Sequence, residues 1–181
     1  MEMPELKTQN LIITLLKPDD VRLLVNYQND NKAYLAKWEP LRTDEYYTAQ
    51  ETKKRIESNL ESFKLGHSIS LVAFNKNKTE IIALCTFSNI VHGAFQACHL
   101  GYSISETYQG KGLMFEMLQS AIHFVFEEYK LHRIMANYMP ENHRSARLLH
   151  QLGFEKEGLA KAYLKIAGEW QDHLLTAKLS S

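Results

Sequence analysis

The segment LGYSISETYQGKGLM, residues 100–114, has the pattern of a strand, a short loop and a glycine-containing helix start. Gly110 and Gly112 allow the backbone to approach a ligand closely. The free N–H groups of the first helical turn and the positive end of the helix dipole favour an anion at this point. The segment therefore predicts a phosphate or pyrophosphate site, and the alternative is a simple tight turn from strand to helix.

Two common nucleotide motifs do not fit this loop. A dinucleotide-binding fingerprint needs a third glycine where Phe115 stands, and no acidic residue follows at the required distance. A P-loop needs G-x-x-x-x-G-K-[ST], which the segment lacks. The sequence therefore excludes both a dinucleotide-binding loop and a P-loop at this position.

The residues on either side of the loop predict an α+β domain. Alternating apolar positions indicate strands, whereas apolar residues at helical spacing and capping patterns indicate helices. Strands are expected near 11–15 and at 69–74, 80–90, 97–104, 132–139, 154–166 and 170–179, and helices at 18–29, from 48 to a stop at 66, 109–129 and 145–152. The result is a mixed, largely antiparallel central sheet flanked by helices, within a single domain over residues 1–181.

Composition narrows the function class. The chain has 181 residues, 45% of them hydrophobic, and its 21 Lys and Arg balance its 21 Asp and Glu. Zero formal charge gives no strong basic field, so no direct nucleic-acid partner is expected.

Cys85 and Cys98 lie in apolar stretches and are expected to be buried thiols in a reducing compartment. The first residues lack an apolar signal region and the run 11–16 is too short for a membrane span, which predicts a cytoplasmic protein without membrane contact.

Residues 109–114 match Q/R-x-x-G-x-G/A, the acyl-CoA pyrophosphate loop of the GCN5-related N-acetyltransferase (GNAT) superfamily, with Met114 in place of the usual small residue. Residues 140–154 resemble the N-x-x-S-x-x-L-L-x-x-x-G-F segment that follows the next strand in that superfamily. With the strands before and after, the resemblance covers nearly the whole chain. Further segments resemble the RimJ branch of the RimJ/RimL acetyltransferases, namely 87–90, 132–140, 153–158, Trp38-Glu39-Pro40 and 170–173.

The resemblance implies a GNAT fold and transfer of acetyl from acetyl-CoA to the N-terminal alanine of a small-subunit ribosomal protein. The ribosomal protein N-terminus is then the partner, and the enzyme a monomer or homodimer. No metal is expected, because the eight histidines lack a pair at metal-ligand spacing with a third ligand. The residues expected to bind acetyl-CoA are Tyr102, Ser103, Ile104, Gln109, Gly110, Lys111, Gly112, Leu113, Met114, Asn142 and Ser145.

Three of these residues have more specific expected roles. The Ser145 hydroxyl resembles the group that protonates the leaving thiolate, and its alternative role is to cap the short helix. The backbone N–H near Tyr102 is the candidate oxyanion donor, with packing as the alternative role of its side chain. Asn142 is expected to reach the pantetheine or phosphate arm, or else to form the turn after Pro140.

The general base is left open by the sequence. An α-amine with a pKa of 7.7–8.0 is already about one-tenth neutral at pH 7, so a modest base suffices. The carboxylate expected in the related enzymes is missing from residues 161–165. Glu39 is the leading candidate for the base, followed by His99 and Asp172. Their alternative roles are, in the same order, a solvated loop acid, a satisfied sheet residue and the partner of a backbone amide. A chain of water molecules is a further candidate for accepting the proton.

The acceptor is expected at an entrance lined by Trp38, Glu39 and Tyr163. Glu39, Asp44 and Glu45 lie together and would attract a basic peptide tail. No nucleophile elbow or reactive-cysteine context is present, which favours direct attack over an acyl-enzyme. Two rival functions remain: a GNAT enzyme for a small-molecule amine such as an antibiotic, a polyamine or an amino acid, and a non-catalytic CoA-binding module in ribosome assembly.

Overall fold

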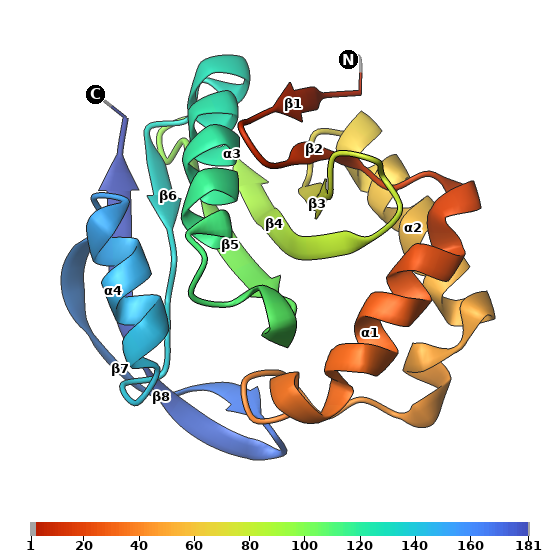
Figure 1. Ribbon diagram of the computed structural model, residues 1–181. Coiled ribbons are helices and arrows are strands. Elements are labelled where there is room, and N and C mark those ends of the chain that lie inside the picture. The colour runs from red at the N-terminus through yellow and green to blue at the C-terminus, as the bar shows by residue number, and fades with distance from the viewer. Residues whose placement is uncertain (1–2, 181) are drawn as a thin grey trace.

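A computed structural model describes residues 3–180, and in these residues the strands form one sheet in the order β1-β2-β3-β4-β5-β6-β8-β7 (Figure 1). Neighbouring strands are antiparallel except β5 and β6, which are parallel. The strands are β1 (Glu5–Lys7), β2 (Ile12–Leu15), β3 (Ile69–Phe74), β4 (Ile81–Val91), β5 (Ala97–Ile104), β6 (Arg133–Met135), β7 (Glu155–Ile166) and β8 (Glu169–Leu179). The helices are α1 (Val21–Leu35), α2 (Ala49–Lys64), α3 (Leu113–Tyr129) and α4 (His143–Gln151). The expected mixed, largely antiparallel sheet is confirmed.

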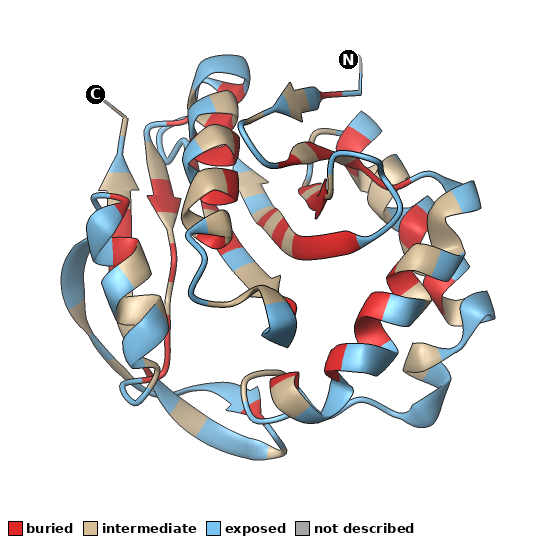
Figure 2. Ribbon diagram, viewed as in Figure 1, coloured by how far each residue is buried: buried red, intermediate tan, exposed pale blue. Residues whose placement is uncertain are grey.

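The two faces of the sheet are covered by different helices. On β3, Leu71 packs in the core beneath α3, whereas its neighbour Val72 packs against α1 and α2. This alternation follows from the two-residue repeat of a strand. Figure 2 shows buried residues along the inner sides of the helices and the central strands, while the β7–β8 hairpin is mostly exposed. Cys85 and Cys98 are buried, as expected.

The central opening in the sheet lies between β5 and β6. These strands pair only over Ala97–His99 and Arg133–Met135, and beyond His99 they part (Figure 1). The strand predicted at 132–139 is therefore too long: past Met135 the chain follows β8 instead, with an isolated bridge from Tyr138 to Leu174. This opening leaves one edge of β5 without a strand partner.

The bounds of α1, α3 and α4 differ from the prediction, and α4 begins at His143 instead of Ser145. The long helix begins at Leu113 and not at 109, because Gly110 and Gly112 have φ angles of +71° and +76°, outside the right-handed helical region. The first helix follows a 3₁₀ turn at Pro18–Asp20 and runs to Leu35. Its last turns are anchored by tertiary contacts: Leu35 is buried beside α2, and the Asn31 side chain accepts the Glu106 N–H at 2.8 Å.

Capping of the short helix corrects one expectation. The N-cap of α4 is Asn142, whose side chain accepts the backbone N–H of Ser145 at 3.1 Å. The capping role considered for Ser145 is therefore wrong. Asn142 caps the helix, and its backbone N–H closes the turn at Pro140 by donating to the Met139 carbonyl at 2.8 Å. At α2 the helix expected from residue 48 is capped there, since the Thr48 hydroxyl accepts the Glu51 N–H.

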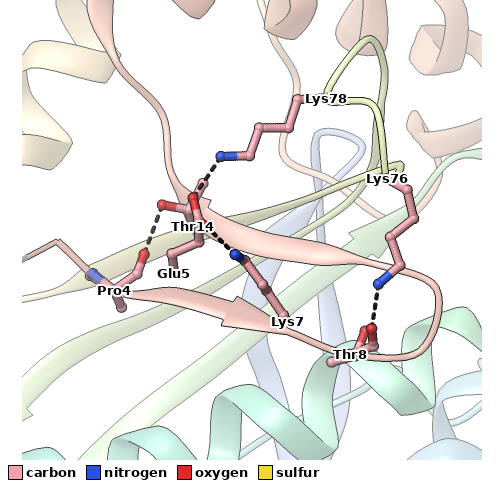
Figure 3. Close-up of polar contacts among 7 residues, drawn as sticks. All are labelled: Pro4, Glu5, Lys7, Thr8, Thr14, Lys76 and Lys78. Carbon is pink, nitrogen blue, oxygen red and sulfur yellow. Dashed lines mark hydrogen bonds and ion pairs between the residues drawn. The ribbon is translucent and has the colours of Figure 1, made fainter.

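The N-terminal strand β1 was not predicted from the sequence. Side chains contact this strand and the residues that flank it. From the turn between β3 and β4, Lys78 contacts Glu5 at 2.6 Å and Lys76 donates to the Thr8 carbonyl at 2.5 Å, and from β2, Thr14 donates to the Pro4 carbonyl at 2.7 Å (Figure 3). The hydrogen bond from Lys78 lowers the pKa of Glu5. No helix within residues 3–180 has the length and apolar character needed to cross a membrane.

Candidate functional site

The glycine loop forms an open cradle at the start of α3. Nothing lies within 4 Å of the position that a Cβ would take at Gly110 or Gly112, so the backbone N–H groups can meet a ligand directly. The side chain of Met114 is buried in the core under α3 and points away from the loop. The side chain therefore does not fill the cradle, which explains how Met114 can stand where the motif usually has a small residue.

A polar atom beside this cradle has no partner. Nε2 of Gln109 is buried and makes no hydrogen bond in the described part of the chain. Such an atom costs free energy unless a ligand or water satisfies it. Lys111 lies next to it and donates to the Thr107 carbonyl at 2.9 Å. The cradle thus combines free N–H donors, a helix N-terminus and an unsatisfied amide, a donor set suited to a diphosphate.

A pair of hydroxyl groups crosses the opening between β5 and β6. Tyr102 lies on β5 and Ser145 in the first turn of α4, and their side-chain oxygens are hydrogen-bonded. Burial raises the pKa of Tyr102 to about 12, so this phenol stays neutral at physiological pH. The pair can therefore deliver a proton to a leaving group in the opening. The oxyanion role of the backbone N–H near Tyr102 stays a prediction.

The strand segment expected to pair with pantetheine has the required free edge. Gly101 and Tyr102 pair with Thr86 and Cys85 of β4 on one side, whereas β6 has already diverged on the other. The Ser103 hydroxyl is hydrogen-bonded to the Tyr27 hydroxyl at 2.9 Å, and Ile104 packs against the core. Ser103 and Ile104 therefore offer backbone groups, and their side chains are engaged elsewhere.

On the sheet face opposite α3 and α4, three side chains form a polar cluster, Asn137, Tyr163 and His173. Asn137 donates to the Tyr163 hydroxyl at 3.3 Å, and the Tyr163 and His173 rings lie 5.7 Å apart. His173 is 4% exposed, and its Nδ1 lies 3.0 Å from the Gln171 carbonyl. Because a carbonyl only accepts, Nδ1 carries the proton and Nε2 is the nitrogen with a free lone pair when the ring is neutral.

Tyr163 was predicted near the acceptor, but Asn137 and His173 were not assigned a role from the sequence. Tyr163 lies on a bulge, because residues 161–163 of β7 stand opposite Asp172 alone. An Asp172 carboxylate oxygen accepts the N–H of Ala162 at 2.8 Å, and Ala162 has a φ of +46°. Asp172 thus has the structural role that was the alternative to general base.

Glu39 follows the end of α1 and faces the β7–β8 turn. Its backbone carbonyl accepts the Ala167 N–H at 2.9 Å, so the segment bearing Trp38 and Glu39 is joined to the hairpin. Burial raises the pKa of Glu39, and nearby Arg42 partly opposes the shift. Within residues 3–180 its carboxylate makes no hydrogen bond or ion pair, so the group is available to a substrate.

The remaining acidic and basic candidates are placed as follows. His99 lies where β5 and β6 part. Its Nδ1 is buried and has no hydrogen-bond partner among residues 3–180, and burial lowers its pKa. Asp44 is paired with Lys32 at 2.9 Å, which neutralises one member of the acidic group expected at the entrance. Among the described residues no cluster of three or more His, Cys, Asp or Glu side chains is arranged to hold a metal ion.

Comparison with known proteins gives consistent matches. Residues 10–155 match the acetyltransferase (GNAT) domain model. The chain is 45% identical over 172 residues to the "[Ribosomal protein uS5]-alanine N-acetyltransferase" of Escherichia coli (strain K12), covering 95% of this chain and 89% of the relative. The ribosomal-protein-S5-alanine acetyltransferase of Vibrio fischeri superposes with a TM-score of 0.93 at 39% identity, covering 97% and 96% of the two chains. Mycobacterium smegmatis RimJ, solved in complex with CoA-disulfide, gives 0.88 at 26% identity, with 94% of this chain and 82% of that chain covered.

Proposed function

The chain belongs to the GNAT acetyltransferase family, and we propose that it transfers acetyl from acetyl-CoA to the N-terminal alanine of a small-subunit ribosomal protein. The observation that carries the proposal is the 45% identity, over 95% of the chain, to the enzyme for uS5 alanine. The single sheet that runs through residues 3–180 supports one domain over residues 1–181. A ribosomal acceptor implies that the reaction takes place in the cytoplasm.

The cosubstrate fits the opening between β5 and β6. The open cradle at Gly110 and Gly112 and the unsatisfied amide of Gln109 suit the diphosphate. The free edge of β5 suits the pantetheine amides, and the Tyr102–Ser145 pair then lies toward the thioester end. Bound acetyl-CoA supplies an activated acetyl group, and the residues of this chain orient it and move protons.

The reaction we infer is direct attack by the neutral α-amine on the thioester carbonyl. A C–N bond forms, the C–S bond breaks, and the sulfur leaves as a thiolate that is protonated through Ser145 and Tyr102. Glu39, unpaired and with a raised pKa, accepts the proton lost by the amine. Trp38 and Tyr163 contact the peptide, with Asn137 holding the Tyr163 hydroxyl in place.

An acceptor panel tests the proposal. The protein is incubated with acetyl-CoA and peptides bearing free N-terminal Ala, Ser or Met, a lysine peptide with a blocked N-terminus, and small amines, while thiol release and product mass are followed. We expect the Ala peptide to give the highest kcat/KM and the blocked peptide to give no product. Transfer to small amines alone would contradict the proposed acceptor, and CoA binding without any transfer would contradict the enzymatic role.

A further inference from the structure

A single arginine side chain connects the walls of the opening. Arg144, the second residue of α4, donates to Oε1 of Gln109 on the glycine loop and to the Tyr34 hydroxyl of α1 at 3.4 Å. Its guanidinium also lies 5.8 Å from the centre of the Tyr34 ring. Three elements that are far apart in sequence therefore meet at this side chain, beside the cradle of Gly110 and Gly112.

The charge of Arg144 has no counterion in the described chain. No carboxylate among residues 3–180 lies within 4.0 Å of its guanidinium, in contrast to Arg133, which has a two-point contact with Glu157. Both acceptors that Arg144 contacts are neutral. The planar fork of donors in a guanidinium matches two oxygens of a phosphate or carboxylate. Arg144 thus carries an unneutralised anion-binding group toward the glycine loop.

The partner it contacts is itself incompletely satisfied. Gln109 accepts from Arg144 through Oε1, while its buried Nε2 has no hydrogen-bond partner in the part of the chain that the structure describes. An anion at the loop would accept from Nε2 of Gln109 and from the guanidinium at the same time. The positive N-terminal ends of α3 and α4 both lie beside this position, since Gly112 and Asn142 are their respective N-caps.

From these contacts we propose that Arg144 binds the diphosphate of acetyl-CoA from the wall opposite the glycine loop. The inference rests on the proposed function and adds a residue outside the glycine loop to the diphosphate site. The diphosphate is the group concerned because Arg144 already contacts Gln109, the first residue of the loop whose backbone N–H groups face it. The loop supplies donors from one side, and Arg144 supplies two charged donors from the other.

Calorimetric titration of three non-reacting ligands tests this assignment. CoA, 3′-dephospho-CoA and pantetheine are titrated into the wild-type protein and the Arg144→Met, Arg144→Lys and Arg147→Met variants. Arg147 lies on the same helix, is exposed, and makes no hydrogen bond or ion pair within the described residues, so its variant controls for loss of charge. Thermal unfolding of each variant shows whether it is folded.

We expect Arg144→Met to weaken CoA and dephospho-CoA equally, by about 10- to 100-fold, as for the loss of a charge-assisted contact. Pantetheine, which lacks the diphosphate, should bind all variants alike, Arg144→Lys should recover part of the affinity, and Arg147→Met should match wild type. Weakening of CoA but not dephospho-CoA would assign Arg144 to the 3′-phosphate and overturn the inference. Equal weakening of pantetheine, or no change, would overturn it too. If the wild-type protein bound no CoA at all, the proposed function would fail instead.

Discussion

The Tyr102 hydroxyl of β5 and the Ser145 hydroxyl of α4 are hydrogen-bonded across the opening between β5 and β6. The two residues come from different elements, 43 positions apart in sequence. Their contact links a strand to a helix, and it joins two hydroxyl groups into one path for a proton. Burial raises the pKa of Tyr102 to about 12, so this hydroxyl keeps its proton at neutral pH.

Replacing either hydroxyl should slow catalysis. We expect Tyr102→Phe and Ser145→Ala each to lower kcat by roughly 10²–10³-fold, because general-acid catalysis contributes about that much. The double variant should be little worse than either single one, since both groups serve one proton path. Steady-state kinetics measure this, with Tyr108→Phe as a control that loses an exposed hydroxyl bonded to Glu80. Full kcat in Tyr102→Phe would contradict the role of the pair.

The pH dependence of stability tests the state of Glu39. Burial raises its pKa above the ordinary value, so the folded chain holds this proton more tightly than the unfolded chain does. The wild type therefore loses stability relative to Glu39→Gln as pH rises through the folded pKa. We expect the variant to have the higher Tm at pH 7 and the difference to shrink toward pH 4. A lower Tm for the variant at pH 7 would show that the carboxylate is stabilised by an unrecognised partner.

The same variant tests the proposed base. Glu39→Gln should lower kcat/KM by about tenfold or more and remove the acidic limb that Glu39 contributes to the pH profile. If kcat/KM at pH 7 were unchanged, Glu39 would not be the base. Water would then accept the proton, since about a tenth of an α-amine is already neutral at pH 7. The measurement is kcat/KM for one Ala peptide between pH 5 and 9.

The glycine loop can be tested with a matched pair of substitutions. Gly112 has a φ of +76° and open space around it, so Gly112→Ala introduces backbone strain without a clash. The expected cost is about 1–2 kcal/mol, seen in the free energy of unfolding or in weaker CoA binding. Gly158 also has open space but no left-handed φ, so Gly158→Ala is the control. Equal effects of the two would argue against the strained loop.

Two substitutions of Asp172 distinguish a structural role of this residue from a catalytic one. Asp172→Asn keeps an oxygen for the Ala162 N–H and should retain near wild-type kcat, whereas Asp172→Ala frees the bulge that carries Tyr163. We expect the Ala variant to raise the peptide KM several-fold with little change in CoA affinity. A large loss of kcat in Asp172→Asn would restore Asp172 as a candidate base.

The sequence is sufficient for features that depend on local pattern. The strands at 69–74 and 97–104 have the predicted bounds, because alternation and flanking turns determine them. The cap at Thr48 and the left-handed Gly66 follow from capping rules in the same way. The glycine loop was identified from its motif, although its helix begins three residues after Gly110 because both glycines are left-handed.

Features that depend on tertiary contacts were not predictable in this way. The last turns of α1 make tertiary contacts, among them the Asn31 side chain, which accepts the N–H of Glu106 from 75 positions away. Asn137 follows β6 and His173 lies in β8, and the sequence of both segments is that of ordinary sheet residues. Only the tertiary arrangement brings them beside Tyr163. Arg144 lies inside the recognised 140–154 segment, but nothing in that segment indicates that it reaches Gln109.

Specificity for the N-terminal amine can be measured by a competition between two amines within one molecule. A peptide with a free N-terminal alanine and an internal lysine is incubated with the protein and acetyl-CoA, and fragment-ion mass spectrometry locates the acetyl group. We expect a single acetyl group on the alanine α-amine and an unmodified lysine. Acetyl on the lysine side chain, or on both amines at similar rates, would contradict that expectation.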